Sequence, residues 1–194
     1  MTSLDALENF TKIDGYRISY AKVGNGPQNL LCLPSATGSW RTDYKPQLEG
    51  ALDRSKFTIV GFDPPGLGKS RPPEREYSKR QILLEKSEHH NVKDAIIAHK
   101  LMQELGLVPY SVLGWGDGGI TAMFLAYEQR ACSDVEKLVL WSTHAYITEE
   151  EGEVYDSIRE INCLSSEMRT PMVQLYGQKY FQSIWAKFLD LRKE

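Results

Sequence analysis

The first part of the chain alternates apolar and polar positions in the pattern of β-strands. Two such runs, at residues 7–13 and 16–23, flank Asp14-Gly15, a dipeptide that strongly favours a two-residue hairpin turn. A short apolar run at 29–33 follows the next glycine-rich break. The pattern therefore predicts an antiparallel hairpin that leads into a third strand.

From residue 57 onward, short apolar runs alternate with longer segments of helical spacing. Nearly continuous apolar runs at 57–62, 110–113 and 135–141 are typical of strands buried on both faces of a sheet. Between them, apolar residues recur every three or four positions, as on the buried face of a helix. Helices are expected at 44–52, at 85–105 and directly after Gly119. This alternation predicts an α/β fold whose strands are joined by parallel crossovers.

The chain after residue 148 has a helical character. Its last apolar stripe, with members three or four positions apart, consists of Phe181, Ile184, Trp185 and Phe188. We expect this stripe to rest on a core that further strands would complete. The predicted organisation is an α/β core over residues 1–147, followed by the start of a helical cap over residues 148–194.

Composition and charge narrow the function classes. The 194 residues include 23 Lys and Arg against 26 Asp and Glu, a formal net charge of −3, and 41% are hydrophobic. These values are typical of one globular domain and argue against disorder and against a dedicated nucleic-acid binder. No apolar run is long enough for a membrane span, so no membrane partner is expected. The acidic start of the chain resembles neither a secretory signal nor a mitochondrial presequence, so a cytoplasmic location is expected.

Cysteine spacing gives no sign of a disulfide framework or a zinc site. Cys32, Cys132 and Cys163 are odd in number and far apart. We expect all three to be reduced packing residues, and we expect neither a metal ion nor a cofactor.

Three loops follow the carboxyl ends of predicted strands, where open α/β sheets bind their ligands. They cover residues 34–40, 63–70 and 114–119. The third loop has glycines spaced as in G-x-S-x-G, the nucleophile elbow that presents a serine at the head of a helix. Gly116 stands at the serine position. Because glycine has no side-chain oxygen, the turn is predicted to lack its nucleophile.

The same turn also fits a rival motif. Gly114, Gly116 and Gly119 satisfy the dinucleotide fingerprint G-x-G-x-x-G between a strand and a helix. That fingerprint normally marks the first βαβ unit, whereas this turn comes late, and Asp117 would repel a pyrophosphate. No carboxylate follows about 20 residues later to bind a ribose hydroxyl. The nucleophile elbow is therefore the favoured interpretation.

Three motifs together resemble a known family, the valacyclovir hydrolase (biphenyl hydrolase-like) proteins of the α/β-hydrolase superfamily. They are DPPGLGKSRPP at 63–73, LGWGDGGITA at 113–122 and HAYITEE at 144–150. The resemblance implies an α/β-hydrolase fold: a mostly parallel sheet with an N-terminal antiparallel hairpin and a partial helical cap. The fold is expected to be C-terminally incomplete, with about six of eight strands. Serine-dependent hydrolysis of α-amino-acid esters is the family reaction that the resemblance implies.

The resemblance also assigns roles to particular residues. Gly116 takes the place of the nucleophile, and the backbone N–H groups of Ala36 and Asp117 take the place of the oxyanion donors. Ser35 stands where the family usually has glycine. The Asp117 carboxylate suits the α-ammonium group of an amino-acid ester, but a carboxylate at a helix N-terminus equally suits the helix dipole. The family's triad acid and histidine follow later strands, and neither is expected within these 194 residues.

The other imidazole and hydroxyl groups are not expected to replace the triad. The histidines are expected at the entry to the cap (His144) and on solvated helix faces (His89, His90 and His99). The hydroxyls near the strand ends, none of them on an elbow, are Ser35, Ser70 and Ser111.

Three functions follow from these observations. The first is a truncated, catalytically inactive relative of the valacyclovir hydrolase-like enzymes. The second is a pseudoenzyme that binds amino-acid esters around Asp117, or binds a protein or a second copy along the strand at 137–141, which the incomplete sheet would leave as an exposed edge. The third is a true hydrolase in which Gly116 is an altered residue and the C-terminal part is missing.

Overall fold

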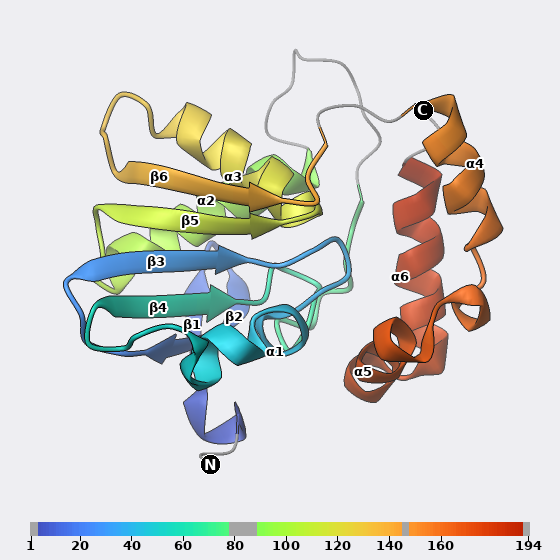
Figure 1. Ribbon diagram of the computed structural model, residues 1–194, viewed down its shortest axis with the longest axis horizontal. Coiled ribbons are helices and arrows are strands. Elements are labelled where there is room, and N and C mark those ends of the chain that lie inside the picture. The colour runs from blue at the N-terminus through green and yellow to red at the C-terminus, as the bar shows by residue number, and fades with distance from the viewer. Residues whose placement is uncertain (1–3, 78–88, 145–147, 192–194) are drawn as a thin grey trace.

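A computed structural model describes residues 4–77, 89–144 and 148–191 and is built around one mixed β-sheet (Figure 1). Its six strands lie in the order β1-β2-β4-β3-β5-β6. They are β1 (Glu8–Ile13), β2 (Tyr16–Val23), β3 (Gln28–Leu33), β4 (Phe57–Phe62), β5 (Tyr110–Trp115) and β6 (Val135–Trp141). β1 and β2 are antiparallel to their neighbours, whereas β4, β3, β5 and β6 run parallel. The predicted fold class, a mostly parallel sheet entered through an antiparallel hairpin, is confirmed.

The hairpin turn lies at the dipeptide that the sequence pattern indicated. Ile13 pairs with Tyr16, and the two residues between them, Asp14 and Gly15, have φ angles of 48° and 86°. Two successive positive φ angles are those of a type I′ turn, whose twist matches the strands that it joins. Lys100 of the helix α2 (His90–Glu104) forms an ion pair with Asp14, with Nζ 2.6 Å from Oδ2. This pair ties the turn to the helix layer.

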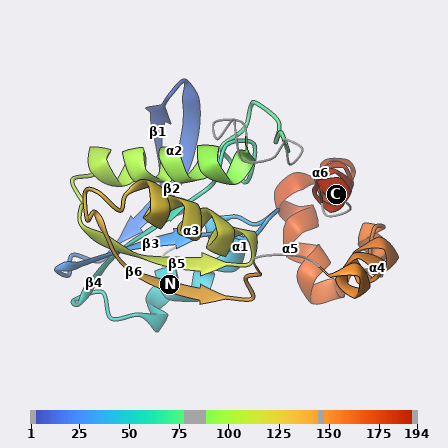
Figure 2. The same cartoon turned by 90° about the horizontal axis from the view of Figure 1, so that it is seen from above.

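Helical segments cover both faces of the sheet, each over its own core (Figure 2). They are η1 (Leu4–Leu7), α1 (Trp40–Asp43), η2 (Gln47–Ala51), α2 (His90–Glu104) and α3 (Asp117–Glu128). Alternate residues of β3 enter the two cores. Leu31 and Leu33 pack under α2 and α3, whereas Leu30 and Cys32 pack with α1 and η2. Because both faces are buried, this strand is a continuous apolar run in the sequence.

Two of the expected helices have other bounds than predicted. The helix expected at 44–52 is broken, since α1 ends at Asp43 and η2 contains Gly50 at a φ of 133°. The expected helix at 85–105 is α2, which begins at His90 after the N-cap residue His89. Residues 85–88 of that prediction lie outside the described residues.

The C-terminal helices lie beside the carboxyl ends of the parallel strands (Figure 1). They are α4 (Glu149–Ser157), η3 (Ile161–Cys163), α5 (Ser166–Tyr176) and α6 (Gln178–Asp190). The apolar stripe of α6 is buried, and it packs against the other C-terminal helices and against Ala36 and Leu67 of the strand-end loops. Tyr176 fastens this layer, because its hydroxyl accepts a hydrogen bond from Gly68 N at 2.8 Å. Within the described residues, the stripe is therefore already buried.

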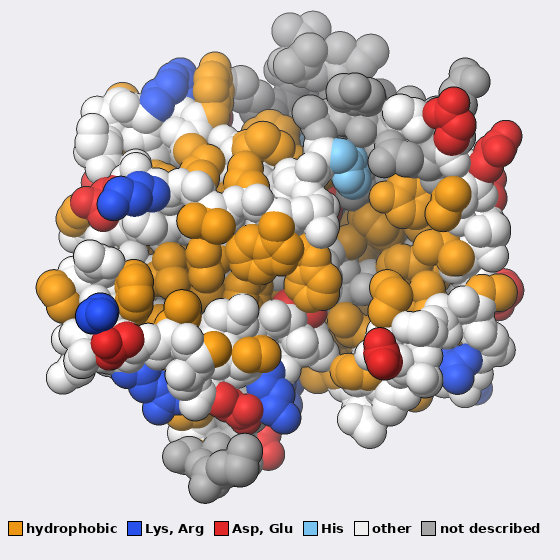
Figure 3. Space-filling model, viewed as in Figure 1, with side chains coloured by type: hydrophobic (Ala, Val, Ile, Leu, Met, Phe, Trp, Pro, Cys, Tyr) orange, Lys and Arg blue, Asp and Glu red, His pale blue; other side chains and the backbone are white. Residues whose placement is uncertain are grey.

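β6 forms one edge of the sheet, as predicted, and among the described strands it pairs with β5 alone. Three consecutive apolar residues of this edge strand, Leu138, Val139 and Leu140, are 36%, 52% and 37% exposed. Hydrophobic side chains gather over the strands on the face seen in Figure 3. An exposed apolar edge strand is a site at which another strand can pair.

The cysteines are free, but they do not share one environment. Cys32 is fully buried in β3, and burial raises the pKa of its thiol. Cys132 and Cys163 are exposed, so their prediction as packing residues is wrong. Among the helices of the described ranges, none combines the length and the apolar character that a membrane crossing requires.

Candidate functional site

The turn between β5 and α3 has the backbone of a nucleophile elbow. Gly116 stands at its centre with φ 56° and ψ −119°, a combination that residues with a side chain rarely adopt. Two hydrogen bonds fix the turn: Gly116 N donates to Trp141 O at 3.1 Å, and Gly119 N donates to Gly116 O at 3.0 Å. The turn therefore holds its central residue at the head of α3, as the spacing predicted.

The glycines of this turn differ in how much space a side chain would have at each position. A Cβ at Gly114 would lie 2.6 Å from the Cα of Gly119. A Cβ at Gly118 would overlap the Leu33 carbonyl oxygen, and a Cβ at Gly119 would overlap the Thr143 hydroxyl. These three positions require glycine because strand and helix pack against one another there.

Gly116 has space that the flanking glycines lack. A Cβ at Gly116 would have as its nearest neighbours Ser35 Cβ at 3.7 Å and Ser142 O at 3.9 Å, which is ordinary van der Waals contact. Packing therefore does not explain the glycine at the centre of the turn. The elbow keeps the glycines that flank its centre. Gly116 at the centre has no side chain and therefore no oxygen that could attack a substrate.

A cavity of about 370 Å³ lies between this turn and the C-terminal helices. It is lined by Gly116 and Asp117 and by Ser35 and Ala36 of the loop after β3. The C-terminal segment contributes Glu167 and a mostly apolar set: Tyr155, Leu164, Met168, Pro171, Met172, Phe181, Trp185 and Phe188. The structure thus places all three residues that the resemblance singled out, Ala36, Gly116 and Asp117, on one cavity.

The loop that carries Ala36 is held in place by a buried carboxylate. Asp43 Oδ2 accepts hydrogen bonds from Ser35 N and from Ser35 Oγ, both at 2.8 Å. Burial raises the pKa of Asp43, and these hydrogen bonds oppose that shift. On the other side, the Tyr77 hydroxyl donates to Ala36 O at 2.8 Å. Ser35 is accommodated in this loop because its side chain turns to Asp43.

Asp117 is the first residue of α3 and is 8% exposed. Its carboxylate Oδ2 lies 3.2 Å from His90 Nε2. Its backbone carbonyl accepts hydrogen bonds from Asn91 Nδ2 at 3.1 Å and from Thr121 Oγ1 at 3.3 Å. The residue stands at a helix N-terminus and also lines the cavity, so its two predicted roles are compatible with one position.

Two histidines predicted to be solvated are buried, and that prediction is wrong. His90 is 5% exposed and contacts Asp117. His99 is buried as well, with Nδ1 2.9 Å from the Tyr110 hydroxyl, and burial lowers its pKa although Asp134 opposes this. His89 is half-buried as the N-cap of α2, and His144 lines the cavity. His90 and His99 are buried because α2 packs against residues that lie far away in the sequence.

An ion pair that the sequence reasoning missed anchors the loop before α2. Arg75 donates through Nη1 and Nη2 to both carboxylate oxygens of Asp94, at 2.9 and 2.6 Å, and both side chains are buried. The Asp94 charge raises the pKa of the Arg75 guanidinium against the opposing effect of burial. Asp94 is followed by apolar Ala95 on the buried side of α2, and a charge among apolar neighbours is the signal that could have pointed to a partner.

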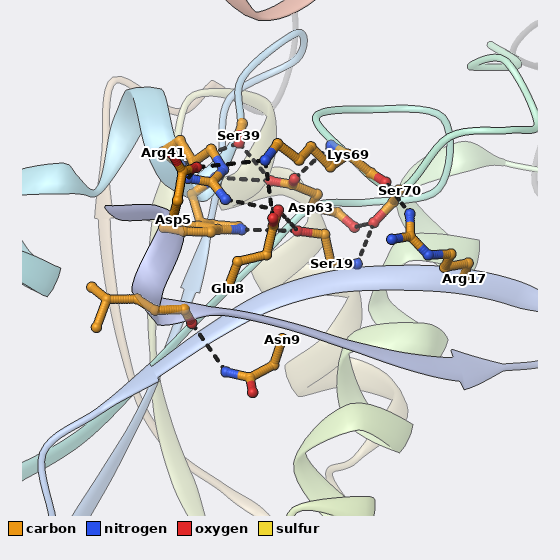
Figure 4. A network of polar contacts seen from close by, with 12 residues as sticks. Asp5, Glu8, Asn9, Arg17, Ser19, Ser39, Arg41, Asp63, Lys69 and Ser70 are labelled. Carbon is orange, nitrogen blue, oxygen red and sulfur yellow. Dashed lines mark hydrogen bonds and ion pairs between the residues drawn. The ribbon is translucent and has the colours of Figure 1, made fainter. Parts of the chain in front are cut away.

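The polar loop after β4 is held by hydrogen bonds within the loop and by hydrogen bonds from the start of α1 (Figure 4). Asp63 is fully buried and accepts from Ser39 Oγ at 2.6 Å, from Trp40 N at 3.1 Å and from Lys69 N at 2.8 Å. Burial raises its pKa to about 6, against the effect of these donors. Ser70 Oγ donates to Asp63 O at 2.7 Å, and Ser70 is itself buried.

Comparison with known proteins identifies the class. A family model described as "alpha/beta hydrolase fold" matches residues 28–156, and the chain belongs to this family. The family match supports the nucleophile elbow over the dinucleotide motif at Gly116. Among solved structures, the epoxide hydrolase CorEH without ligand has a TM-score of 0.68 at 18% identity, over 96% of this chain and 75% of that chain. At this identity the likeness concerns the fold.

Within the family, the chain is similar to two mammalian proteins. Serine hydrolase BPHL from Mus musculus and serine hydrolase BPHL from Homo sapiens are each 36% identical to it over 178 residues. These matches cover 92% of this chain and 57% of each relative. The chain therefore spans little more than half the length of the curated relatives that it matches.

Proposed function

We propose that this chain is a catalytically inactive relative of serine hydrolase BPHL that keeps a binding pocket for α-amino-acid esters. In this proposal, residues 1–147 are the hydrolase core and residues 148–194 are the cap over the pocket. The observation that carries it is Gly116, a residue without a nucleophile in an elbow whose backbone and flanking glycines are intact.

The absence of a hydroxyl at position 116 supports inactivity. Removal of a serine nucleophile from such a site lowers turnover by about 10⁶-fold. The oxyanion donors that remain retain roughly 10³-fold catalysis over water, too little for a working esterase. Two hydroxyls near the strand ends do not replace the serine, because Ser35 is turned to Asp43 and Ser70 is buried in its own loop.

The cavity supports ligand binding. Its volume of about 370 Å³ lies within the range of small-molecule pockets. Asp117 lines it beside Gly116, so a carboxylate stands next to the place where a substrate carbonyl would lie. An α-ammonium group would pair with this carboxylate, and the apolar wall formed by Met168, Met172 and Phe181 would contact the side chain or the alcohol part of an ester.

Binding and turnover are tested on the same ligand. Calorimetric titration with L-phenylalanine methyl ester should give saturable binding, and the N-acetylated ester, which has no ammonium group, should bind at least about tenfold more weakly. Asp117→Asn should lower the affinity by about 10- to 100-fold. Saturable binding that is indifferent to both changes would contradict the ammonium role of Asp117.

Inactivity is tested by the release of methanol and by a fluorophosphonate probe that labels activated serines. We expect no labelling and no turnover above the uncatalysed rate. Turnover above about 1% of that of an intact serine hydrolase of this family would overturn the proposal, since loss of the nucleophile alone should lower it far below that level.

A second candidate function is binding of a protein chain along β6. The exposed apolar residues Leu138, Val139 and Leu140 on an edge strand favour it. Sedimentation velocity should detect association at micromolar concentration, and Val139→Lys should abolish it, because a charged side chain on an edge strand opposes pairing. A monodisperse, cooperatively unfolding monomer would argue against this function.

A further inference from the structure

Two adjacent residues at the start of α2 contact the side-chain carboxylate and the backbone carbonyl of Asp117. His90 contacts the carboxylate, with Nε2 3.2 Å from Oδ2, and Asn91 donates through Nδ2 to the backbone carbonyl at 3.1 Å. Both residues of α2 are buried, with His90 5% exposed. The side chain that the proposed function assigns to an ammonium group is therefore positioned by an imidazole.

The surroundings of His90 fix its ring and determine which nitrogen faces Asp117. Tyr77 packs edge-on against the ring at 5.3 Å between centroids, and His89 stacks on it at 4.7 Å. The other ring nitrogen, Nδ1, is buried without a hydrogen-bond partner in the described part of the chain. A neutral His90 thus donates from Nε2 to the carboxylate, and a second proton at Nδ1 would place a cation directly beside Asp117.

Charged and titratable groups surround this pair from four segments. Those on β2, on the loop at 74–77, at the start of α2 and on α3 are Tyr16, Glu74, Arg75, Glu76, Tyr77, His89, Lys93, Asp94 and Asp117. Arg75 is neutralised by its ion pair with Asp94. Asp117 is the carboxylate that the structure places against a nitrogen of His90 within hydrogen-bond distance.

We propose that His90 is a positioning residue that holds the Asp117 carboxylate for a cationic ligand and limits ammonium binding to pH values at which His90 is neutral. This inference rests on the proposed function. With His90 neutral, Asp117 presents a net negative charge to the cavity. With His90 protonated, the two side chains form a neutral ion pair, and an incoming ammonium group is repelled by the nearby imidazolium.

The test uses an amino-acid amide, L-phenylalaninamide, which carries the ammonium group and has no ester to hydrolyse. Its affinity is measured by calorimetry at pH 7.0 and pH 5.5. For the unaltered chain we expect the affinity to fall about tenfold or more at the lower pH. His90→Gln keeps an N–H donor toward Asp117 but cannot gain a proton, so its affinity should change less than about twofold.

His99→Gln is the matched control. His99 is a buried histidine on the same helix, but it contacts Tyr110 and Asp134 rather than Asp117. Its variant should retain the pH dependence of the unaltered chain. If His90→Gln and His99→Gln respond to pH alike, the inference is wrong.

A second measurement does not depend on any variant folding. Binding at pH 5.5 in two buffers with different ionisation enthalpies should reveal that the unaltered chain releases a proton when the ammonium ligand binds. No proton release would overturn the inference. If Asp117→Asn binds the amide as well as the unaltered chain at pH 7.0, the proposed function fails; if Asp117→Asn weakens binding but the pH dependence survives in His90→Gln, only the role of His90 fails.

Discussion

Asp63 and Asp117 occupy comparable positions in the fold but have different surroundings. Each is buried, and each follows a parallel strand of the same sheet, Asp63 after β4 and Asp117 after β5. Asp63 is enclosed by donors from α1 and from its own loop, and it is not among the residues that line the cavity of about 370 Å³. Asp117 is held from one side by α2 and lines the large cavity.

The difference shows that a carboxylate at the end of a strand is no sign of a binding site by itself. Three hydrogen bonds satisfy Asp63 within the protein, and its loop is thereby a structural support for α1. Asp117 lies where the C-terminal helices and the elbow leave space. What separates a structural carboxylate from a candidate ligand-binding one is the space in front of it.

Replacement of Asp63 should have the largest effect on stability. Asp63→Ala would leave the donors of Ser39, Trp40 and Lys69 without their acceptor in a buried place, and we expect the free energy of unfolding to fall by about 3–5 kcal/mol. Asp117→Ala should lower it by about 1–2 kcal/mol, since fewer groups lose a partner. Urea denaturation followed by circular dichroism measures both. Equal losses would remove the distinction between the two aspartates.

Alanine substitutions within the elbow should separate its flanks from its centre. Gly118→Ala would force a Cβ onto the Leu33 carbonyl oxygen, so we expect a loss of about 2–4 kcal/mol in the free energy of unfolding. Gly116→Ala meets nothing closer than 3.7 Å and should lose about 1–2 kcal/mol, from the positive φ alone. Thermal and urea unfolding of the pair tests this. A greater loss at Gly116 would mean that the centre of the turn is tightly packed after all.

The pH dependence of stability should carry the signature of Asp63. Burial raises its pKa from 3.8 to about 6, so the folded state binds the proton more tightly than the unfolded state does. The contribution of this carboxyl group to stability is therefore fully present below about pH 4 and is lost as the pH rises to about 6. Asp63→Asn, which does not titrate, should gain stability relative to the unaltered chain over that interval. A difference between the two that stays constant from pH 4 to pH 6.5 would contradict the raised pKa.

Introduction of a serine at position 116 should have the smallest effect on ester turnover. Gly116→Ser places a hydroxyl where Cβ space exists, and we expect no gain in ester turnover, because the histidine that the structure places closest to Asp117 is turned to its carboxylate. Methanol release from the methyl ester of L-phenylalanine measures it, with the fluorophosphonate probe as a second readout. Activity recovered by this single change would show that a described imidazole already acts as a base.

Long-range contacts explain where the sequence-based predictions failed. His90 and His99 were expected on solvated helix faces, yet they contact Asp117 and Tyr110, which lie 27 and 11 positions away. Arg75 and Asp94 pair across 19 positions, and no periodicity links them. Pairing of this kind depends on how α2 docks against the loops, which a local pattern does not contain.

The sequence by itself determined the elements that local chemistry dictates. Asp14-Gly15 fixed the hairpin turn, the apolar runs fixed β4, β5 and β6, and the glycine spacing fixed the elbow around Gly116, because turn geometry and the burial period of a strand are set by neighbouring residues. Tertiary structure alone decided that Asp63 is enclosed, that Asp117 faces a cavity and that His90 stands behind it. Burial and charge pairing arise only when segments far apart in the sequence come together, and for that reason the chemistry of this site became visible only in the folded chain.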